Sequence, residues 1–146
     1  MPELPEVETV CRGLVPVMQG QKIKSVRLNR DSLRIPIPRA FSSTLSGQKV
    51  SSIIRRGKYI LAFCENEAGF VLHLGMSGRV KILAHHKDYV PEKHDHVIFE
   101  MQNNACIVFN DPRRFGFVDL TDAKSWETRK PFSHMGPEPM GNAFNG

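Results

Sequence analysis

Apolar residues in the first twenty positions recur at the spacing of a helix. Five of them share one helical face: Leu4, Val7, Cys11, Leu14 and Met18. Pro5 suits a first helical turn, where its missing N–H is not needed, and Gly20 is a suitable C-terminal stop. Pro16 falls inside the pattern, so we expect the last turn to be kinked or already finished there.

After this helix the pattern changes to short apolar stretches separated by turn residues. A strand is predicted at 21–28, a basic loop at 30–39 and a short helix at 40–45. Seven more strands are predicted at Lys49–Arg55, Tyr59–Cys64, Phe70–Leu74, Arg79–Leu83, Val97–Met101, Ala105–Phe109 and Phe117–Leu120. The fold class is therefore α+β and mostly β: an antiparallel β-sandwich or flattened barrel with an N-terminal α-helix.

The pattern changes again near the end of the chain. The length of 146 residues suits one domain, which we place at residues 1–130. Residues 131–146 are rich in Pro, Gly and Asn and poor in apolar residues, so we expect a linker that leads out of the domain. The stretch 84–92 is polar and is expected to be a surface loop.

Composition narrows the class of partner. A net charge of +5 and a pI near 9.3 favour a polyanionic partner, and the basic residues recur in clusters. No apolar run spans a membrane and no signal peptide opens the chain, so we expect a cytoplasmic protein. Its three separated cysteines predict free, partly buried thiols.

The first residues offer a candidate nucleophile. If Met1 is removed, Pro2 becomes a terminal secondary amine with a pKa of roughly 8, partly neutral at cellular pH. Such an amine attacks carbonyl-like carbons and forms an iminium, and Glu3 beside it can move protons. The same residues also read as an ordinary helix start with a Met-Pro leader.

Three turns carry further candidates. Lys58 lies between two predicted strands, where it can reach a phosphate or donate a proton, or can simply be a solvated charge. Glycines bracket Met76 in HLGMSG, which places it at a loop tip as a possible wedge between base pairs or as core filler. In NDPRRFG, Arg113 can hydrogen-bond a base edge, while Phe115 either stacks on a base or packs inward. We expect both Met76 and Phe115 to be exposed at their loop tips in the free protein.

Histidine and arginine clusters complete the candidates. His94 and His96 are two apart and face the same side if they lie on a strand. Two histidines without a third ligand are a poor metal site, so we predict no metal and favour a phosphate contact or a turn-stabilising role. In the basic loop at 30–39, Arg34 and Arg39 are alternative phosphate contacts.

Together these segments resemble one family. The chain is similar to the N-terminal domain of bacterial formamidopyrimidine-DNA glycosylase, in the order MPELPEVETV, RRGKY, HLGMSG, KHDH, NDPRRFG and MGPEP. The opening and NDPRRFG are the most specific segments, and the match covers nearly the whole chain. The sister endonuclease VIII group, a weaker alternative, also starts with Met-Pro-Glu but lacks the pairing of Met76 with Arg113 and Phe115.

The resemblance implies roles and partners. Pro2 would attack the sugar C1′, Glu3 would assist sugar opening and Lys58 would act as acid/base and phosphate contact. Met76, Arg113 and Phe115 would fill the gap left by a flipped damaged base, while His94 and His73 would contact the DNA backbone. The implied partner is double-stranded DNA with an oxidised purine or an abasic site, bound by a monomer.

The resemblance also implies what the chain lacks. The family continues into a helix–two-turn–helix domain and a zinc finger, and neither is present in these 146 residues. We therefore expect no cofactor here and at most weak activity. Two other classes stay open: a DNA-binding module without catalysis, which retained Met1 would produce, and an N-terminal-proline tautomerase. The tautomerases place their proline on a strand, whereas this one enters a helix.

Overall fold

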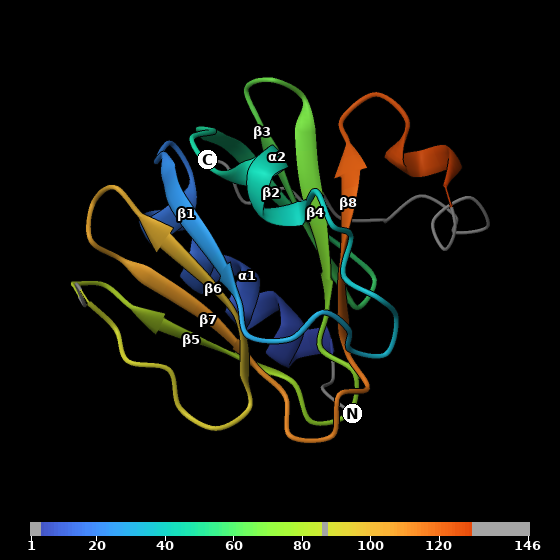
Figure 1. The fold of residues 1–146 in the computed structure, drawn as a ribbon. Helices are drawn as coiled ribbons and strands as arrows, with labels where there is room; N and C mark the ends of the chain where they lie inside the picture. The colour runs from blue at the N-terminus through green and yellow to red at the C-terminus, as the bar shows by residue number, and fades with distance from the viewer. Residues whose placement is uncertain (1–3, 86–87, 130–146) are drawn as a thin grey trace.

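Two antiparallel four-stranded sheets form the body of the molecule (Figure 1). The computed structural model describes residues 4–85 and 88–129. The first sheet has the order β1-β6-β7-β5 and the second has the order β2-β3-β4-β8. The strands are β1 Ile23–Leu28, β2 Val50–Arg56, β3 Tyr59–Cys64, β4 Ala68–His73, β5 Arg79–Leu83, β6 Asp95–Met101, β7 Cys106–Asn110 and β8 Phe117–Asp122.

Each of the two α-helices in the described residues packs against both sheets. Helix α1, Leu4–Met18, packs against the edge strands β5 and β2 and against β3. Helix α2, Phe41–Leu45, packs against β1 of the first sheet and β4 of the second. A short 3-10 turn at Trp126–Thr128 follows β8. The expected α+β fold, a sandwich with an N-terminal helix, is confirmed.

Helix α1 does not end at its proline. It runs through Pro16 to Met18, although a proline inside a helix removes one backbone hydrogen bond. Of the two expected alternatives, a kinked last turn or a finished helix, the second is therefore excluded, and the helix ends just before Gly20, the expected stop. Leu14 and Met18, on either side of the proline, are buried in the core, and this packing holds the last turn in place.

Aromatic contacts join the layers of the core. The ring of Phe70 on β4 stacks on Phe99 of β6, with centroids 4.7 Å apart. Phe41 of α2 meets both rings edge-on, at 6.3 and 6.2 Å. Each such pair adds roughly 0.5–1.5 kcal/mol beyond its area burial. The three rings therefore join α2 to one strand of each sheet in the core.

The cysteines are free thiols, as predicted. Cys11, Cys64 and Cys106 are all buried. Burial raises the pKa of the Cys11 thiol to about 12 and that of the other two to about 11. These thiols are therefore protonated at neutral pH and behave as small apolar residues.

The described residues of the stretch 84–92, between β5 and β6, are exposed, as predicted, with one exception. Residues 84–92 were expected to form a polar surface loop, yet Tyr89 within it is buried and its hydroxyl donates to the carboxylate of Asp95. Strand β6 begins at Asp95, two residues earlier than the predicted Val97.

Among the described residues, no helix is long and apolar enough to cross a membrane.

Candidate nucleic-acid interface

The strand register brings several loops to one end of the sandwich. His73, the last residue of β4, pairs with Tyr59 at the start of β3 and with Phe117 at the start of β8. In the other sheet, Asn110 at the end of β7 pairs with Arg79 and Asp95, which begin β5 and β6. The turns that hold Lys58, Met76, His94 and the segment 111–116 therefore share this end.

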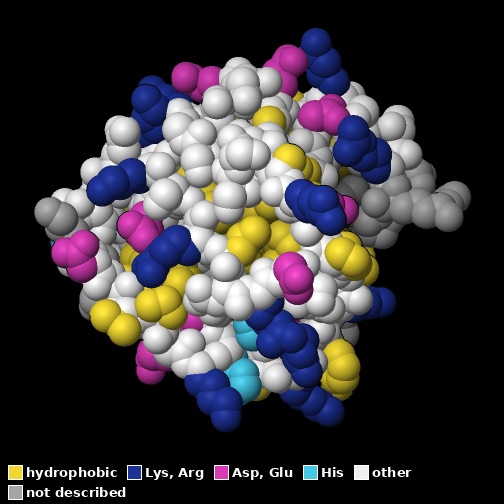
Figure 2. Space-filling model, viewed as in Figure 1, with side chains coloured by type: hydrophobic (Ala, Val, Ile, Leu, Met, Phe, Trp, Pro, Cys, Tyr) yellow, Lys and Arg dark blue, Asp and Glu magenta, His cyan; other side chains and the backbone are white. Residues whose placement is uncertain are grey.

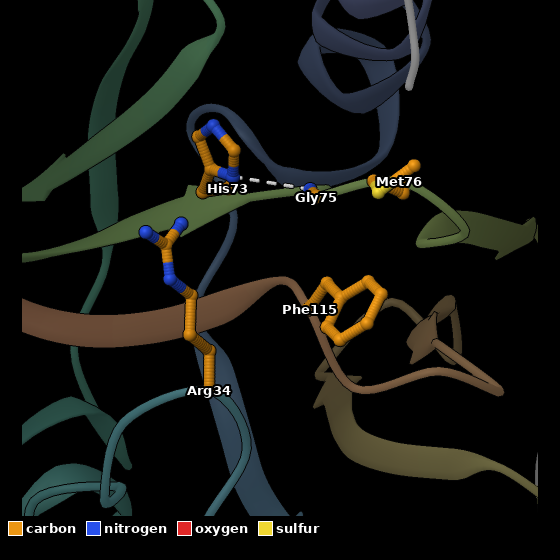
Figure 3. Close-up of a pocket in the computed structure, with 5 residues that line it drawn as sticks. All are labelled: Arg34, His73, Gly75, Met76 and Phe115. Carbon is orange, nitrogen blue, oxygen red and sulfur yellow. Dashed lines mark hydrogen bonds between the residues drawn. The ribbon is translucent and has the colours of Figure 1, made fainter.

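His73 forms a wall of the site. Its ring is buried, stacks on Phe117 at an interplanar angle of 8° and contacts Tyr59. The backbone N–H of Gly75 donates to its Nδ1 over 3.0 Å, so the neutral ring carries its proton on Nε2 (Figure 3). Burial lowers the pKa of His73, and the charges of Arg34 and Lys58 lower it further. The imidazole is therefore neutral at pH 7.

Met76 stands at the tip of the loop between β4 and β5. Its side chain is 51% exposed, as predicted. Gly75 beside it has φ 65°, and a Cβ there would lie 2.4 Å from the backbone nitrogen of Gly116. A Cβ on Gly116 would in turn lie 2.4 Å from the carbonyl oxygen of His73. The two loops touch backbone to backbone, which only glycine permits.

Phe115 and Arg113 lie on the second of these loops. Phe115 is 43% exposed, so the prediction that both apolar tips are exposed is confirmed. The guanidinium of Arg113 lies over the Phe115 ring at 5.2 Å, a cation–π distance. The backbone N–H of Arg113 donates to Oγ of Ser77 over 3.2 Å. The arginine and the phenylalanine are thus presented as a pair.

Asp111 holds three loops together. Its fully buried carboxylate accepts the Ser77 hydroxyl on one oxygen and the Gly116 N–H on the other, the latter over 2.9 Å. Its backbone N–H donates to the carbonyl of His94 over 3.1 Å. Its backbone oxygen accepts Nε2–H of His96 over 2.7 Å. The sequence indicated only an Asp-Pro turn here and did not identify this role.

The two predicted strand histidines have different environments. His94 precedes β6, has φ 71° and is partly exposed, whereas His96 is buried and lies on β6. Their rings are 6.3 Å apart. Burial lowers the pKa of His96, so its ring is neutral while it donates to Asp111. Within residues 4–85 and 88–129, no three His, Cys, Asp or Glu side chains are grouped to hold a metal.

A second buried carboxylate anchors the segment before β6. Asp95 accepts hydrogen bonds from Lys81, Tyr89, Asn110 and the N–H of Glu92. Burial alone would raise its pKa, but these donors lower it to about 2. Burial alone would lower the pKa of Lys81, but its hydrogen bonds to Asp95, Tyr89 and Glu92 raise it. The ion pair between Lys81 of β5 and Asp95 of β6, 2.8 Å from nitrogen to oxygen, holds the start of β6 in place next to His94.

Lys58 follows Gly57 in the turn between β2 and β3, and Gly57 has φ 59°. Its strand neighbour Tyr59 pairs with His73, and the Lys58 charge acts on that ring. The turn thus brings Lys58 near His73. Pro2 and Glu3, the proposed nucleophile and acid, lie outside the described residues.

A cavity of about 380 Å³ opens among these loops, lined by Arg34, His73, Gly75, Met76 and Phe115. Figure 3 shows Arg34 and His73 on one side of it and Met76 and Phe115 on the other. Lysine, arginine and histidine side chains also gather along the lower edge of the face in Figure 2, below the sheets of Figure 1. The arrangement combines apolar tips with cations, as an anionic aromatic ligand requires.

The fold is that of a known domain. The sequence profile of the formamidopyrimidine-DNA glycosylase N-terminal domain matches residues 1–118, and the chain belongs to this family. The resemblance inferred from the motifs is thereby confirmed.

Relatives and solved structures agree with this assignment. The chain is 49% identical to a formamidopyrimidine-DNA glycosylase of Roseobacter denitrificans and 48% identical to one of Cereibacter sphaeroides, covering 99% and 100% of this chain. It spans 53% and 54% of those relatives, about half their length. A Lactococcus lactis Fpg solved with DNA containing an abasic site superposes with a TM-score of 0.76 at 30% identity, over 85% of this chain and 45% of that one. A MutM bound to DNA with a carbocyclic 8-oxo-G gives 0.76 at 32%, over 86% and 46%.

Proposed function

We propose that this chain is the N-terminal part of a base-excision repair glycosylase and abasic-site lyase that acts on oxidised purines in double-stranded DNA. The observation that carries the proposal is the pair of exposed tips, Met76 and Phe115, fixed by one buried carboxylate beside a cationic cavity. Exposed apolar side chains on rigid loops suit insertion between base steps, which unstacks a duplex.

The family supplies the substrate class. Structures similar to this chain were solved with an abasic site, with a carbocyclic 8-oxo-G and with an N7-benzyl-Fapy-dG in DNA. We extend that class to this chain. Its relatives are bacterial proteins, and the DNA of a bacterium lies in the cytoplasm, where we place this protein.

The chemistry follows from the resemblance and starts at Pro2. The damaged nucleotide is flipped out of the stack, and Met76, Phe115 and Arg113 occupy the gap. The amine of Pro2 forms a bond to C1′ while the glycosidic bond breaks and the base leaves with a proton. Glu3 protonates the ring oxygen as the sugar opens to the iminium. Loss of a C2′ proton then expels the 3′ phosphate, and a second elimination expels the 5′ phosphate.

Borohydride trapping on DNA with an abasic site tests this proposal. Reduction of the iminium leaves a covalent adduct, and peptide mapping should place it on Pro2 in protein whose mass shows that Met1 is absent. Pro2→Gly keeps a terminal amine and should retain some trapping, whereas protein that retains Met1 should give none. Equal trapping with Met1 retained would point to a lysine and refute the assignment. Absence of the adduct in every form of the protein would favour the other class, a DNA-binding module without catalysis.

A further inference from the structure

The segment 29–40 presents one arginine to the cavity. Ser32 and Pro36 form an antiparallel bridge, and the N–H of Leu33 donates to the carbonyl of Ile35 over 2.9 Å. Arg34 is at the tip of this small closed loop. Its own N–H donates to the carbonyl of Gly116 over 3.2 Å, which ties the tip to the end of the Phe115 loop.

The base of the same loop is held by the body of the protein. Ile37 is buried, and its N–H donates to the carbonyl of Asp31 over 3.0 Å. Asn29 donates from its backbone to His96 and from its side chain to the carbonyl of Asp95. The Arg34 backbone is therefore held in place at the tip and at the base of the loop. Little further ordering of the loop is needed when a ligand binds, so the entropic cost of binding is smaller.

The charge of Arg34 is not neutralised in the part of the chain that the structure describes. Its side chain is exposed and has no hydrogen-bond or ion-pair partner there. Lys58, the other cation close to His73, has no such partner either. Within residues 4–85 and 88–129 these two cations are unpaired, and beside a neutral histidine they produce a positive potential that favours an anion. Arginine is the side chain best suited to a phosphodiester, because its planar fork donates two parallel hydrogen bonds.

We propose that Arg34 binds a backbone phosphate of the strand into which Met76 and Phe115 insert. The apolar side of the cavity takes a base or sugar, and the guanidinium on the opposite side takes the phosphate of the same stretch of strand (Figure 3). The sequence left Arg34 and Arg39 as equal alternatives. The structure separates them, because Arg39 lines a different cavity, with Leu28, Asn29, Arg30, Asp31, Ile37 and Pro38. This inference rests on the proposed function.

Salt dependence of DNA binding tests the inference. We would compare the unchanged chain with Arg34→Ala, Arg34→Lys and the matched control Arg39→Ala, by fluorescence anisotropy on a duplex that carries a reduced abasic site. Loss of one phosphate contact should lower the slope of log K against log salt by about 0.9. It should also weaken binding roughly tenfold or more, as expected for a hydrogen bond to a charged group. Arg34→Lys should keep the slope but not the full affinity, and Arg39→Ala should keep both.

A second measurement does not depend on DNA. The pKa of His73, followed by NMR in the free protein, should rise in Arg34→Ala because a nearby cation has been removed, and should not change in Arg39→Ala. Unaltered thermal unfolding of both variants would show that neither change disturbs the fold.

The outcomes separate this inference from the function on which it rests. Binding by the unchanged chain with the same slope in Arg34→Ala, or with equal losses in both alanine variants, would overturn the role of Arg34 alone. Absence of binding to any duplex by the unchanged chain would overturn the proposed function and this inference together.

Discussion

At the scale of single residues, Asp111 joins the loops that carry Met76, His94 and Phe115. Its carboxylate accepts hydrogen bonds from the two tip loops, 74–78 with Met76 and 111–116 with Phe115. Its backbone bonds to both histidines of the KHDH segment. Buried hydrogen bonds of this kind are costly to break, because the freed donors lose their contact with water as well. The relative position of Met76 and Phe115 therefore depends on this residue.

Asp111→Asn should lower the free energy of unfolding by about 1–3 kcal/mol, because an amide offers one acceptor where two buried donors need one each. Urea unfolding at neutral pH measures the change. The control is Asp31→Asn, an exposed aspartate in the basic loop, which should change stability by less than about 0.5 kcal/mol. Equal losses in the two variants would show that Asp111 is not a special anchor.

Gly75 allows a test of the contact between the two tip loops. Gly75→Ala combines a positive φ of 65° with a Cβ placed 2.4 Å from the Gly116 nitrogen, so the loops must separate. Gly20→Ala is matched, because Gly20 has φ 78° but nothing within 4 Å of the new Cβ. The strain common to both costs about 1–2 kcal/mol. Unfolding of Gly75→Ala should show a clearly larger loss, and similar losses would argue against close contact.

At the scale of elements, the loop between β5 and β6 is held by charge. Lys81 on β5, Tyr89 in the loop and Asp95 at the start of β6 form a connected network. The pairing is largely withdrawn from water, since the Asp95 side chain is fully buried and that of Lys81 is 21% exposed. The network thereby places His94 next to the tip loops.

This network makes stability depend on acid pH. The folded-state pKa of Asp95 is about 2, below the ordinary 3.8, so ionised Asp95 favours the folded state. Its contribution, roughly 2 kcal/mol, is complete above about pH 4 and is lost as the pH falls toward 2. Asp95→Asn should therefore be less stable than the unchanged chain at pH 5, with a difference that shrinks toward pH 2.5.

Glu92→Gln is the control for this pH profile. Glu92 pairs with the same lysine, but its side chain is 73% exposed, so the pair contributes little. Its unfolding curves should follow those of the unchanged chain from pH 5 to 2.5. If the gap between Asp95→Asn and the unchanged chain stayed constant over that range, the carboxylate would not be the source of the pH dependence.

The elements were predictable from the sequence to the extent that they depend on local patterns. The period of α1, the strands between turns and the exposure of Met76 and Phe115 all follow from neighbouring residues. The roles of Asp95 and Asp111 do not, because each depends on partners that only the strand register brings near. The sequence left two alternatives at Pro16 for the same reason, since the packing of Leu14 and Met18 is what carries the helix past it. Arg34 and Arg39 were equivalent until the cavities distinguished them.

At the scale of the whole molecule, apolar tips and cations occupy the same end, and this combination should govern DNA binding. Met76→Ala and Phe115→Ala remove exposed side chains, so folding stability should change by less than about 0.5 kcal/mol. Affinity for a duplex with an abasic gap should fall roughly tenfold, the order expected when a stacking side chain is lost. Anisotropy binding curves on gapped and intact duplexes measure the effect.

Val90→Ala is the control for these two substitutions. Val90 is the most exposed large apolar residue described, at 76%, yet it does not line the cavity. Its replacement should leave binding to both duplexes unchanged. If all three substitutions weakened binding alike, general surface hydrophobicity would explain the result, and Met76 and Phe115 would not be wedges.

The strand order has a consequence for how the chain folds. Strands β2, β3 and β4 are consecutive neighbours joined by tight turns, so this meander closes only short loops. In contrast, the pairings of β1 with β6 and of β4 with β8 join strands that are far apart in the sequence. Contacts of high sequence separation form slowly. Because the loop that carries Phe115 closes against the end of β4 only when β8 pairs with that strand, we expect the binding surface to be completed late in folding.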